Sequence, residues 1–269
     1  MRNILTLSDS KYGAQGIALY NSLRAVNTDF VLHYLCLDKK MYKAIKNLDG
    51  CTAYQLDDII ISGEEIEQHR RTHTWEKHCW TLASYFLTCL RGFGVGSGGD
   101  TSLLYVDADM YFYQDFEKIY DDIGRRSVGI ISHRFNHDRE TKTGKYNVGI
   151  IYFKDDKRGN ACLKWWSDVV INDNNEWFET YGTCGDQKYL ELFEGLFPGA
   201  IRVVDVEHGA PWNVQHIDGN DLVFFHFSHF AIHGGGYTTN RAGEWKPEAT
   251  PWAKELYNDY YEVIKQIKL

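Results

Sequence analysis

The sequence predicts an α/β fold in which a mostly parallel central sheet is flanked by helices and the C-terminal half is rich in loops. Three observations support this prediction. Strand and helix patterns alternate through the first third of the chain, which is the order of βαβ units. Residues 31–37 form a nearly continuous apolar run, as expected of a strand buried on both faces. Beyond residue 171 the pattern becomes irregular and aromatic until a last helix.

In the first third of the chain, apolar spacing of two predicts strands and spacing of three and four predicts helices. We expect strands at residues 2–7, 31–37, 51–56 and 58–61, and helices at residues 14–26 and 39–48. The clearest helix is residues 74–91, because six apolar side chains recur there at helical spacing: Cys79, Leu82, Ala83, Phe86, Leu87 and Leu90.

The same rules predict the later elements. We expect strands at residues 102–106, 128–132 and 146–153, and helices at residues 155–171, 188–193 and 252–267. No linker of low complexity divides the chain, so residues 1–269 are expected to form a single domain.

Composition and charge exclude several classes of protein. The 269 residues include 29 Lys and Arg against 37 Asp and Glu, and the net charge of −8 disfavours a nucleic-acid-binding surface. No segment approaches the ~20 apolar residues of a membrane-spanning helix, and the N-terminus becomes polar too early for a signal peptide. We therefore expect a cytoplasmic protein whose six cysteines are reduced, mostly buried thiols.

The sharpest chemical signal is a pair of carboxylates directly after the strand at residues 102–106. Asp107 and Asp109 are one residue apart, and alternate side chains of an extended chain point the same way. Open α/β sheets bind ligands at the carboxyl ends of their strands. Two carboxylates in a cleft repel each other unless a cation lies beside them, and oxygen ligands suit Mg²⁺ or Mn²⁺. The pair predicts a divalent-metal site; a solvated turn is the alternative.

Polar residues also stand at the ends of later elements. They are Asn147 and Gly149, Asp186 and Gln187, Trp212 and Asn213, and the late histidines His226 and His229. An amide and a glycine at a strand entrance allow close approach of a ligand. Each also has an ordinary structural interpretation: a plain strand start for Asn147, and a hydrogen-bonded core residue for either histidine.

The ordered set of motifs is more specific than any member. It comprises Ser8-Asp9-Ser10-Lys11-Tyr12, Val106-Asp107-Ala108-Asp109, Tyr146-Asn147-Val148-Gly149, Gly185-Asp186-Gln187, Trp212-Asn213 and His226-Phe227. From residue 3 to about residue 230, the chain resembles the GT-A fold nucleotide-sugar glycosyltransferases, most closely the glycogenin/lipopolysaccharide galactosyltransferase type. The resemblance implies a Rossmann-like GT-A sheet and a hexosyltransferase that moves a sugar from a nucleotide-diphosphate donor, expected to be a UDP-sugar, to a glycan or lipid-linked acceptor, with retention.

The resemblance also implies residue roles. Mn²⁺ or Mg²⁺ is expected to bind Asp107, Asp109 and His226, with His229 as the alternative histidine. The nucleotide is expected to contact Ser8, Asp9, Tyr12, Lys77 and Asp107, with Lys77 replacing the arginine usual in the family. Asn147, Asp186, Trp212 and Asn213 are expected to line the donor sugar and the acceptor. Gln187 and Asp186 are the implied catalytic residues: Gln187 stabilises the reacting sugar, and Asp186 holds its hydroxyls or, in an inverting enzyme, acts as the base.

The implied division of the domain places the nucleotide in residues 1–110, the donor sugar and acceptor in residues 111–240, and a C-terminal helix in residues 250–269. Two alternatives stay open for that helix: packing on the sheet, or contact with the inner membrane face through Lys254, Lys265 and Lys268. Trp177 and Tyr181 are expected near the acceptor, because aromatic faces pack against sugar rings. Polysaccharide or lipopolysaccharide synthesis is the implied context.

Two other functions remain alternatives. One is a non-catalytic carbohydrate-binding protein or an inactive relative of the transferases. The other is a sugar-1-phosphate nucleotidyltransferase, which needs a glycine-rich motif after the first strand that residues 8–13 do not supply. The glycine-rich segment at residues 94–99 follows a helix and precedes a strand, the reverse of the dinucleotide-binding order.

Overall fold

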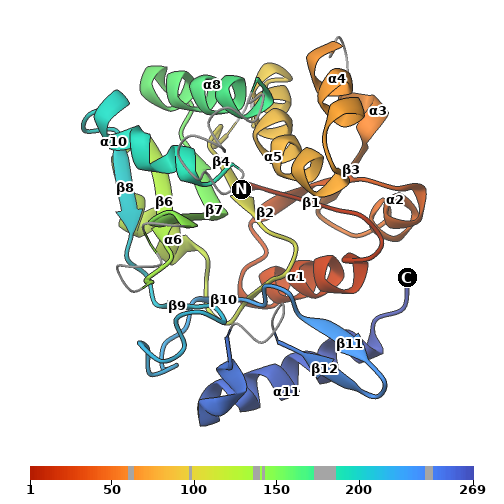
Figure 1. Ribbon diagram of the computed structural model, residues 1–269. Helices are drawn as coiled ribbons and strands as arrows, with labels where there is room; N and C mark the ends of the chain where they lie inside the picture. Colours follow the sequence, from red (N-terminus) through yellow and green to blue (C-terminus); the bar gives the residue numbers. More distant parts are fainter. Residues whose placement is uncertain (60–63, 97–98, 136–139, 141–142, 173–185, 240–244) are drawn as a thin grey trace.

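A seven-stranded mixed sheet forms the centre of the molecule (Figure 1). The computed structural model describes residues 1–269 except residues 60–63, 97–98, 136–139, 141–142, 173–185 and 240–244. The strand order is β3-β2-β1-β4-β7-β6-β8. The strands are β1 (Arg2–Ser8), β2 (Phe30–Cys36), β3 (Cys51–Gln55), β4 (Leu103–Val106), β6 (Val128–Ser132), β7 (Tyr146–Phe153) and β8 (Ile201–Val204).

The sheet is mostly parallel, as predicted. Strands β3, β2, β1 and β4 run parallel to one another, and so do β6 and β8. Strand β7 is antiparallel to both of its neighbours, β4 and β6. Every residue of β4 is buried, as are the last five of β2, so these strands are apolar along their length rather than alternating.

Helices cover both faces of the sheet. On one face, α1 (Gly13–Val26), α2 (Lys39–Ile45) and α6 (Glu117–Ile123) pack against the side chains of residues such as Ile4 and Leu104. On the other face, α5 (Trp75–Gly92) and α8 (Lys157–Ile171) lie next to each other. They cover Leu5 and Tyr105, which follow Ile4 and Leu104 in the sequence and so point to the opposite face. The Thr74 and Asp156 side chains accept backbone N–H groups at the starts of α5 and α8, which explains where these helices begin.

A second, smaller layer carries the end of the chain. Strand β10 (Phe224–His226) lies between β5 (Met110–Phe112) and β9 (His208–Gly209). Further on are a hairpin of β11 (Ala231–His233) and β12 (Gly236–Thr238), the 3₁₀ segment η2 (Pro247–Ala249) and helix α11 (Pro251–Gln266).

Helix α11 packs on this layer with its aromatic face. Tyr257 and Tyr260 contact the ring of Phe227, and the Phe227 and Tyr260 rings stack with centroids 3.7 Å apart. Of the two alternatives for this helix, packing on the fold is therefore observed for its apolar face. Among the described helices, none has the length and apolar character that crossing a membrane requires.

Several sequence expectations need correction. Of the strand expected at residues 58–61, residues 58 and 59 lie instead in the short helix α3 (Leu56–Ile59), and residues 60 and 61 lie outside the described residues. The Asp58 carboxylate accepts the Gln55 N–H and so caps this helical turn. Helix α2 ends at Ile45, three residues earlier than expected. The expected helix at 188–193 is the 3₁₀ segment η1 (Lys188–Leu192), which is followed by α10 (Phe193–Leu196). Helix α4 (Glu64–Thr72) was not predicted.

The cysteines follow the expectation in the described part of the chain. Cys36, Cys51, Cys79, Cys89 and Cys162 are free thiols, and each is buried or half-buried. Burial raises the pKa of Cys36 and Cys51 to about 12, so both stay protonated and unreactive. Cys184, Trp177 and Tyr181 lie outside the described residues.

Candidate metal and sugar-donor site

The acid pair and one late histidine meet where the two layers join. Strand β4 ends at Val106, and the chain turns through Asp107 and Asp109 into β5. Strand β10 pairs antiparallel with β5 and places His226 opposite Met110. Two backbone hydrogen bonds anchor the turn: Asp107 N–H donates to the Gly149 carbonyl, and the Asp109 carbonyl accepts the Phe227 N–H. The sheet and the second layer therefore both fix the turn.

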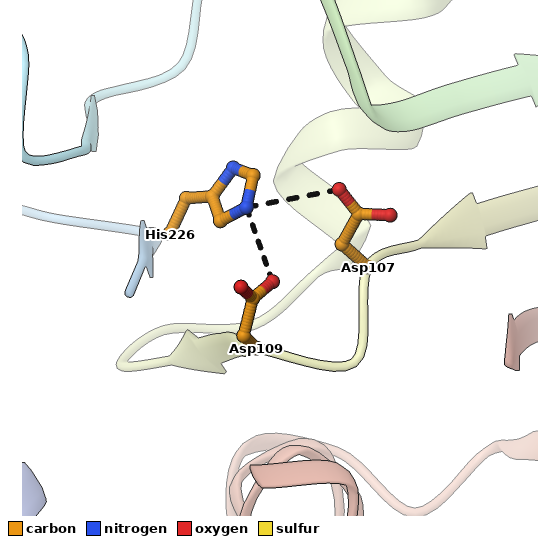
Figure 2. Close-up of side chains that lie close together, drawn as sticks. All are labelled: Asp107, Asp109 and His226. Carbon is orange, nitrogen blue, oxygen red and sulfur yellow. Dashed lines mark ion pairs between the residues drawn. The ribbon is translucent and has the colours of Figure 1, made fainter. Parts of the chain in front are cut away.

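The three side chains point toward one another (Figure 2). His226 Nε2 lies 3.1 Å from Asp109 Oδ1 and 3.7 Å from Asp107 Oδ2. The His226 side chain is 8% exposed, Asp109 14% and Asp107 28%, so the group opens to solvent on the Asp107 side. The Tyr105 hydroxyl donates a 2.9 Å hydrogen bond to the other Asp107 oxygen, Oδ1.

Burial and the mutual influence of the three side chains determine the electrostatics of this group. Burial, the largest influence, and the nearby Asp109 charge raise the pKa of Asp107 to about 6, although His226 opposes them. Burial also opposes ionisation of Asp109, but the His226 imidazole outweighs it and the pKa of Asp109 is lowered. Burial alone would lower the pKa of His226, yet the two carboxylates together raise it.

The donor set suits a hard divalent cation. One ligand atom from each of Asp107, Asp109 and His226 lies within 4.8 Å of the others, and no other such group of three occurs in the described part of the chain. Carboxylate oxygens with one imidazole are suitable ligands for Mn²⁺ or Mg²⁺. Of the two predicted histidines, the cluster contains His226. His229 lies nearby, with φ of +60°, close enough for its charge to lower the pKa of Asp109.

A chain of hydrogen bonds supports this corner from behind. The Gly149 N–H donates to Asn147 Oδ1 at 2.8 Å, which leaves the Asn147 amide nitrogen to donate to His133 Nε2 at 3.1 Å. Gly149 itself has no room for a side chain, because a Cβ there would lie 3.0 Å from His226 Nδ1. Asn147 thus joins β7 to the end of β6 behind the acid pair.

Trp212 and Asn213 lie beside the same corner. The Trp212 indole N–H donates to the His133 carbonyl at 3.0 Å, and its ring packs edge-on against His226 with centroids 5.4 Å apart. Asn213 is fully buried and closes its own turn by accepting the Ala210 N–H. Trp245 meets the Trp212 ring with centroids 5.5 Å apart and extends the aromatic wall.

Asp186 and Gln187 approach from the η1 side. Asp186 is 5% exposed, and burial together with the Asp107 charge raises the pKa of its carboxyl to about 8. The Trp166 indole N–H fixes the Asp186 backbone by donating to its carbonyl at 3.1 Å. The Gln187 side-chain amide donates to the Thr143 carbonyl at 3.2 Å. A buried carboxyl with a raised pKa therefore lies within electrostatic range of Asp107.

The predicted nucleotide residues occupy the end of β1 and the start of α5. Tyr12 is 42% exposed, and burial followed by the Asp109 charge raises the pKa of its hydroxyl to about 12, so it lies toward the acid pair. The Asp9 carboxylate accepts the Lys11 N–H at 2.9 Å and shapes this turn. The Ser8 hydroxyl is instead buried against the Tyr34 hydroxyl at 2.6 Å.

Lys77 lies in the first turn of α5, where its N–H donates to the capping Thr74 hydroxyl. Its charge also acts on His69, whose pKa burial and neighbouring cations lower to about 4.

Two residues of this site were not predicted from the sequence: Tyr105 and Trp245. Tyr105 has a recognisable signal, because it precedes Asp107 by two residues on the same strand and so shares its face. Trp245 has none, since its contact with Trp212 spans 33 residues and three short strands that the sequence pattern does not predict.

Comparisons with known proteins bear on the fold of this chain. No family model matches the chain. The Bacillus subtilis (strain 168) protein YfnF, described as uncharacterized, is 28% identical over 244 residues, which is 81% of this chain and 78% of YfnF. A second uncharacterized protein of that strain, YfnD, is 27% identical over 235 residues, or 80% of this chain and 73% of YfnD.

Among solved structures, the chain is similar to the galactosyltransferase LgtC in complex with donor and acceptor sugar analogues, with 17% identity and a TM-score of 0.55 over 99% of this chain and 96% of LgtC. Mouse xyloside xylosyltransferase 1 is 12% identical with a TM-score of 0.52, over 84% of this chain and 97% of that protein. The Streptococcus pneumoniae TIGR4 glycosyltransferase GlyE is 14% identical with a TM-score of 0.56, over 97% and 63% of the two chains.

These similarities confirm the predicted fold: the chain has the GT-A glycosyltransferase fold. Its acidic cluster lies at the carboxyl end of a central strand, where open α/β sheets bind ligands.

Proposed function

We propose that this protein is a metal-dependent glycosyltransferase that moves a hexosyl group from a nucleoside-diphosphate donor, a UDP-sugar, to a glycan or lipid-linked acceptor. The observation that carries the proposal is the convergence of Asp107, Asp109 and His226 at the end of β4 in a GT-A fold. A bound cation would reduce the repulsion between the two carboxylates of this cluster. The same cation would bind the oxygens of a diphosphate.

The bound Mn²⁺ or Mg²⁺ would neutralise the charge that develops on the departing diphosphate. The chain's own residues would bind and orient the rest of the donor. Asp9 and the exposed Tyr12 lie at the end of β1, on the side that the nucleoside would occupy, and Lys77 begins the neighbouring helix. Ser8 would contact the nucleoside through its backbone only, because its hydroxyl is bonded to Tyr34.

The sugar would lie between the metal corner and η1. Burial and the Asp107 charge raise the pKa of the Asp186 carboxyl to about 8 before a metal binds, and in either protonation state this carboxyl can form a hydrogen bond with a sugar hydroxyl. Gln187, held by its bond to Thr143, and Asn147, held by its bond to His133, would contact the sugar as well, and Gln187 would stabilise the reacting anomeric centre. With Asp186 assigned to the sugar hydroxyls, we propose transfer with retention. Product anomers measured by NMR at early times test this, and an inverted product would reassign Asp186 as the base.

The acceptor would meet the aromatic wall. Trp212 is pinned by its indole N–H and presents its ring beside His226, which suits the apolar face of a sugar. Asn213 fixes the turn that carries Trp212. A lipid-linked acceptor would bring the protein to the inner face of a membrane, in polysaccharide or lipopolysaccharide synthesis.

Ligand-dependent thermal stability tests the proposal. At 100 times its Kd, UDP with Mn²⁺ should stabilise the fold by about 2.7 kcal/mol, and neither UDP nor Mn²⁺ alone should do as much. Asp109→Asn should abolish the joint effect, while the matched surface variant Asp155→Asn should keep it. If no nucleoside diphosphate stabilises the protein with any divalent metal, a carbohydrate-binding protein or an inactive relative becomes the better description. Release of pyrophosphate from a sugar 1-phosphate and a nucleoside triphosphate would instead show a nucleotidyltransferase.

A further inference from the structure

The hydroxyl of Tyr105 is an unassigned polar group directly beneath the acid pair. Tyr105 lies on β4, and its ring belongs to the core between the sheet and helices α5 and α8. The residue is 4% exposed, and its hydroxyl is bonded to Asp107 Oδ1 at 2.9 Å. A phenylalanine would fill this core position equally well, so packing does not require the hydroxyl.

The direction of this hydrogen bond is fixed. A phenol carries its proton at neutral pH and an ionised carboxylate can only accept, so the Tyr105 hydroxyl donates. Asp107 Oδ1 is the acceptor, and the second oxygen, Oδ2, is the one that faces His226. The phenol thus selects which Asp107 oxygen is presented to the metal corner.

His226 holds the Asp109 carboxylate more closely than the Asp107 carboxylate. The Asp109 carboxylate contacts His226 at 3.1 Å, within hydrogen-bonding distance, whereas Asp107 Oδ2 is 3.7 Å from the same nitrogen. The terminal torsion of an aspartate has broad, roughly two-fold preferences. Without the Tyr105 hydroxyl, the 28%-exposed Asp107 side chain would retain its weaker contact and could rotate toward solvent.

The same hydrogen bond has an electrostatic effect on the acid pair. The donated proton places partial positive charge at Asp107 Oδ1, and this lowers the repulsion between the Asp107 carboxylate and the neighbouring Asp109 carboxylate.

We propose that Tyr105 is a positioning residue that orients Asp107 for divalent-metal binding. The inference rests on the proposed function, because it takes Asp107 as a metal ligand. It goes further by assigning a role to a core tyrosine that does not itself touch the metal or the sugar donor. Groups that orient ligands in this way commonly change metal affinity 10–100-fold when removed.

The test is Mn²⁺ affinity, measured by electron paramagnetic resonance of free Mn²⁺ with the full chain and no nucleotide. Tyr105→Phe should weaken Mn²⁺ binding about 10–100-fold. At saturating Mn²⁺ the variant should recover most of the wild-type kcat, since only the position of a ligand is disturbed. The matched control is Tyr120→Phe, which removes a buried hydroxyl without a hydrogen-bond partner, from a ring that packs on the opposite face of the sheet. It should leave Mn²⁺ affinity unchanged.

A double-mutant cycle separates orientation from general destabilisation. In an Asp107→Asn background, Tyr105→Phe should have no further effect on Mn²⁺ affinity, because the oriented ligand is already lost. An equal fall in both backgrounds would overturn the inference, and so would unchanged Mn²⁺ affinity in Tyr105→Phe alone. Both results leave the proposed function intact if the wild type binds Mn²⁺. Failure of the wild type to bind Mn²⁺ would instead overturn the metal site itself.

Discussion

His226 and His133 lie in adjoining regions of the molecule and show how neighbours decide the chemistry of a buried imidazole. Both contact the Trp212 ring, with centroids 5.4 and 5.5 Å away, and both are almost fully buried. Nε2 of His226 faces two carboxylates, whereas Nε2 of His133 faces the amide nitrogen of Asn147.

The two pKa values diverge accordingly. The carboxylates outweigh burial at His226 and raise its pKa, while burial lowers the pKa of His133 to about 3. The His226 corner therefore has the negative potential that a cation requires, and the His133 region keeps a neutral ring that holds Asn147. Burial alone therefore does not give an imidazole the surroundings that a cation requires; at His226 the two carboxylates provide them.

Replacing each histidine by glutamine tests whether Mn²⁺ binding depends on His226 and not on His133. His226→Gln should lower Mn²⁺ affinity by about 100-fold or more, since loss of a ligand should cost at least as much as loss of a group that orients one. His133→Gln should change Mn²⁺ affinity less than tenfold, because its ring bonds to Asn147 rather than to a ligand. Mn²⁺ titrations of the two variants measure both effects. Equal losses would show that the two histidines belong to one functional unit.

The strands of the central sheet were predicted except for β8 at its edge, and most of the short elements elsewhere were not. The ends of β6 and β7 fall where the sequence predicts them, because long apolar runs leave little freedom in a buried sheet. Helix α3 has only four residues, too few for periodicity to show. The three residues of β5 form a strand because β10 pairs with them, and that pairing joins positions more than 110 residues apart.

The candidate site was also only partly predictable from the sequence. The spacing of Asp107 and Asp109 alone predicts a metal site, but His226 joined it only through the resemblance to known transferases. The bond from Asn147 to His133 depends on the β6–β7 pairing, whose register shifts between Ile130 and Ile131. An irregularity of that kind moves every later side chain relative to its partner. The sequence pattern does not locate it, so this bond could not be predicted.

Gly149 lies between the His133 region and the His226 corner, so a methyl group there would crowd both. In Gly149→Ala, the new Cβ would lie 2.6 Å from Asn147 Oδ1 and 3.0 Å from His226 Nδ1, closer than atoms normally approach. We expect a loss of about 3 kcal/mol in the free energy of unfolding, at the upper end for an overpacked core, together with weaker Mn²⁺ binding. Urea denaturation measures the first effect.

The control for that variant is Gly92→Ala at the end of α5, where a Cβ would meet nothing within 4 Å. It should leave stability the same or raise it by about 0.5–1 kcal/mol. If Gly149→Ala changes the free energy of unfolding as little as Gly92→Ala does, small movements relieve the crowding at Gly149. The His226 corner then tolerates a change behind it.

The smallest expected effect concerns the neutral state of His133. Its pKa is about 3 in the fold, mainly because of burial, with the charges of His226 and His208 acting in the same direction. An unfolded histidine has a pKa of about 6.5, so the unfolded chain binds the extra proton first as the pH falls. The stabilisation is therefore complete above about pH 6.5 and declines toward pH 3, with about 2 kcal/mol lost by pH 5.

Urea denaturation at pH 7.5 and pH 5 isolates this contribution by difference. His33 and His78 also have a pKa lowered to about 4, so the wild type should lose stability from several histidines at once. His133→Gln should lose about 2 kcal/mol less than the wild type over that interval, whatever its stability at pH 7.5. Equal losses in the two proteins would mean that His133 is protonated in the fold at pH 5. The contrast with His226 would then be one of hydrogen-bond partners rather than of charge.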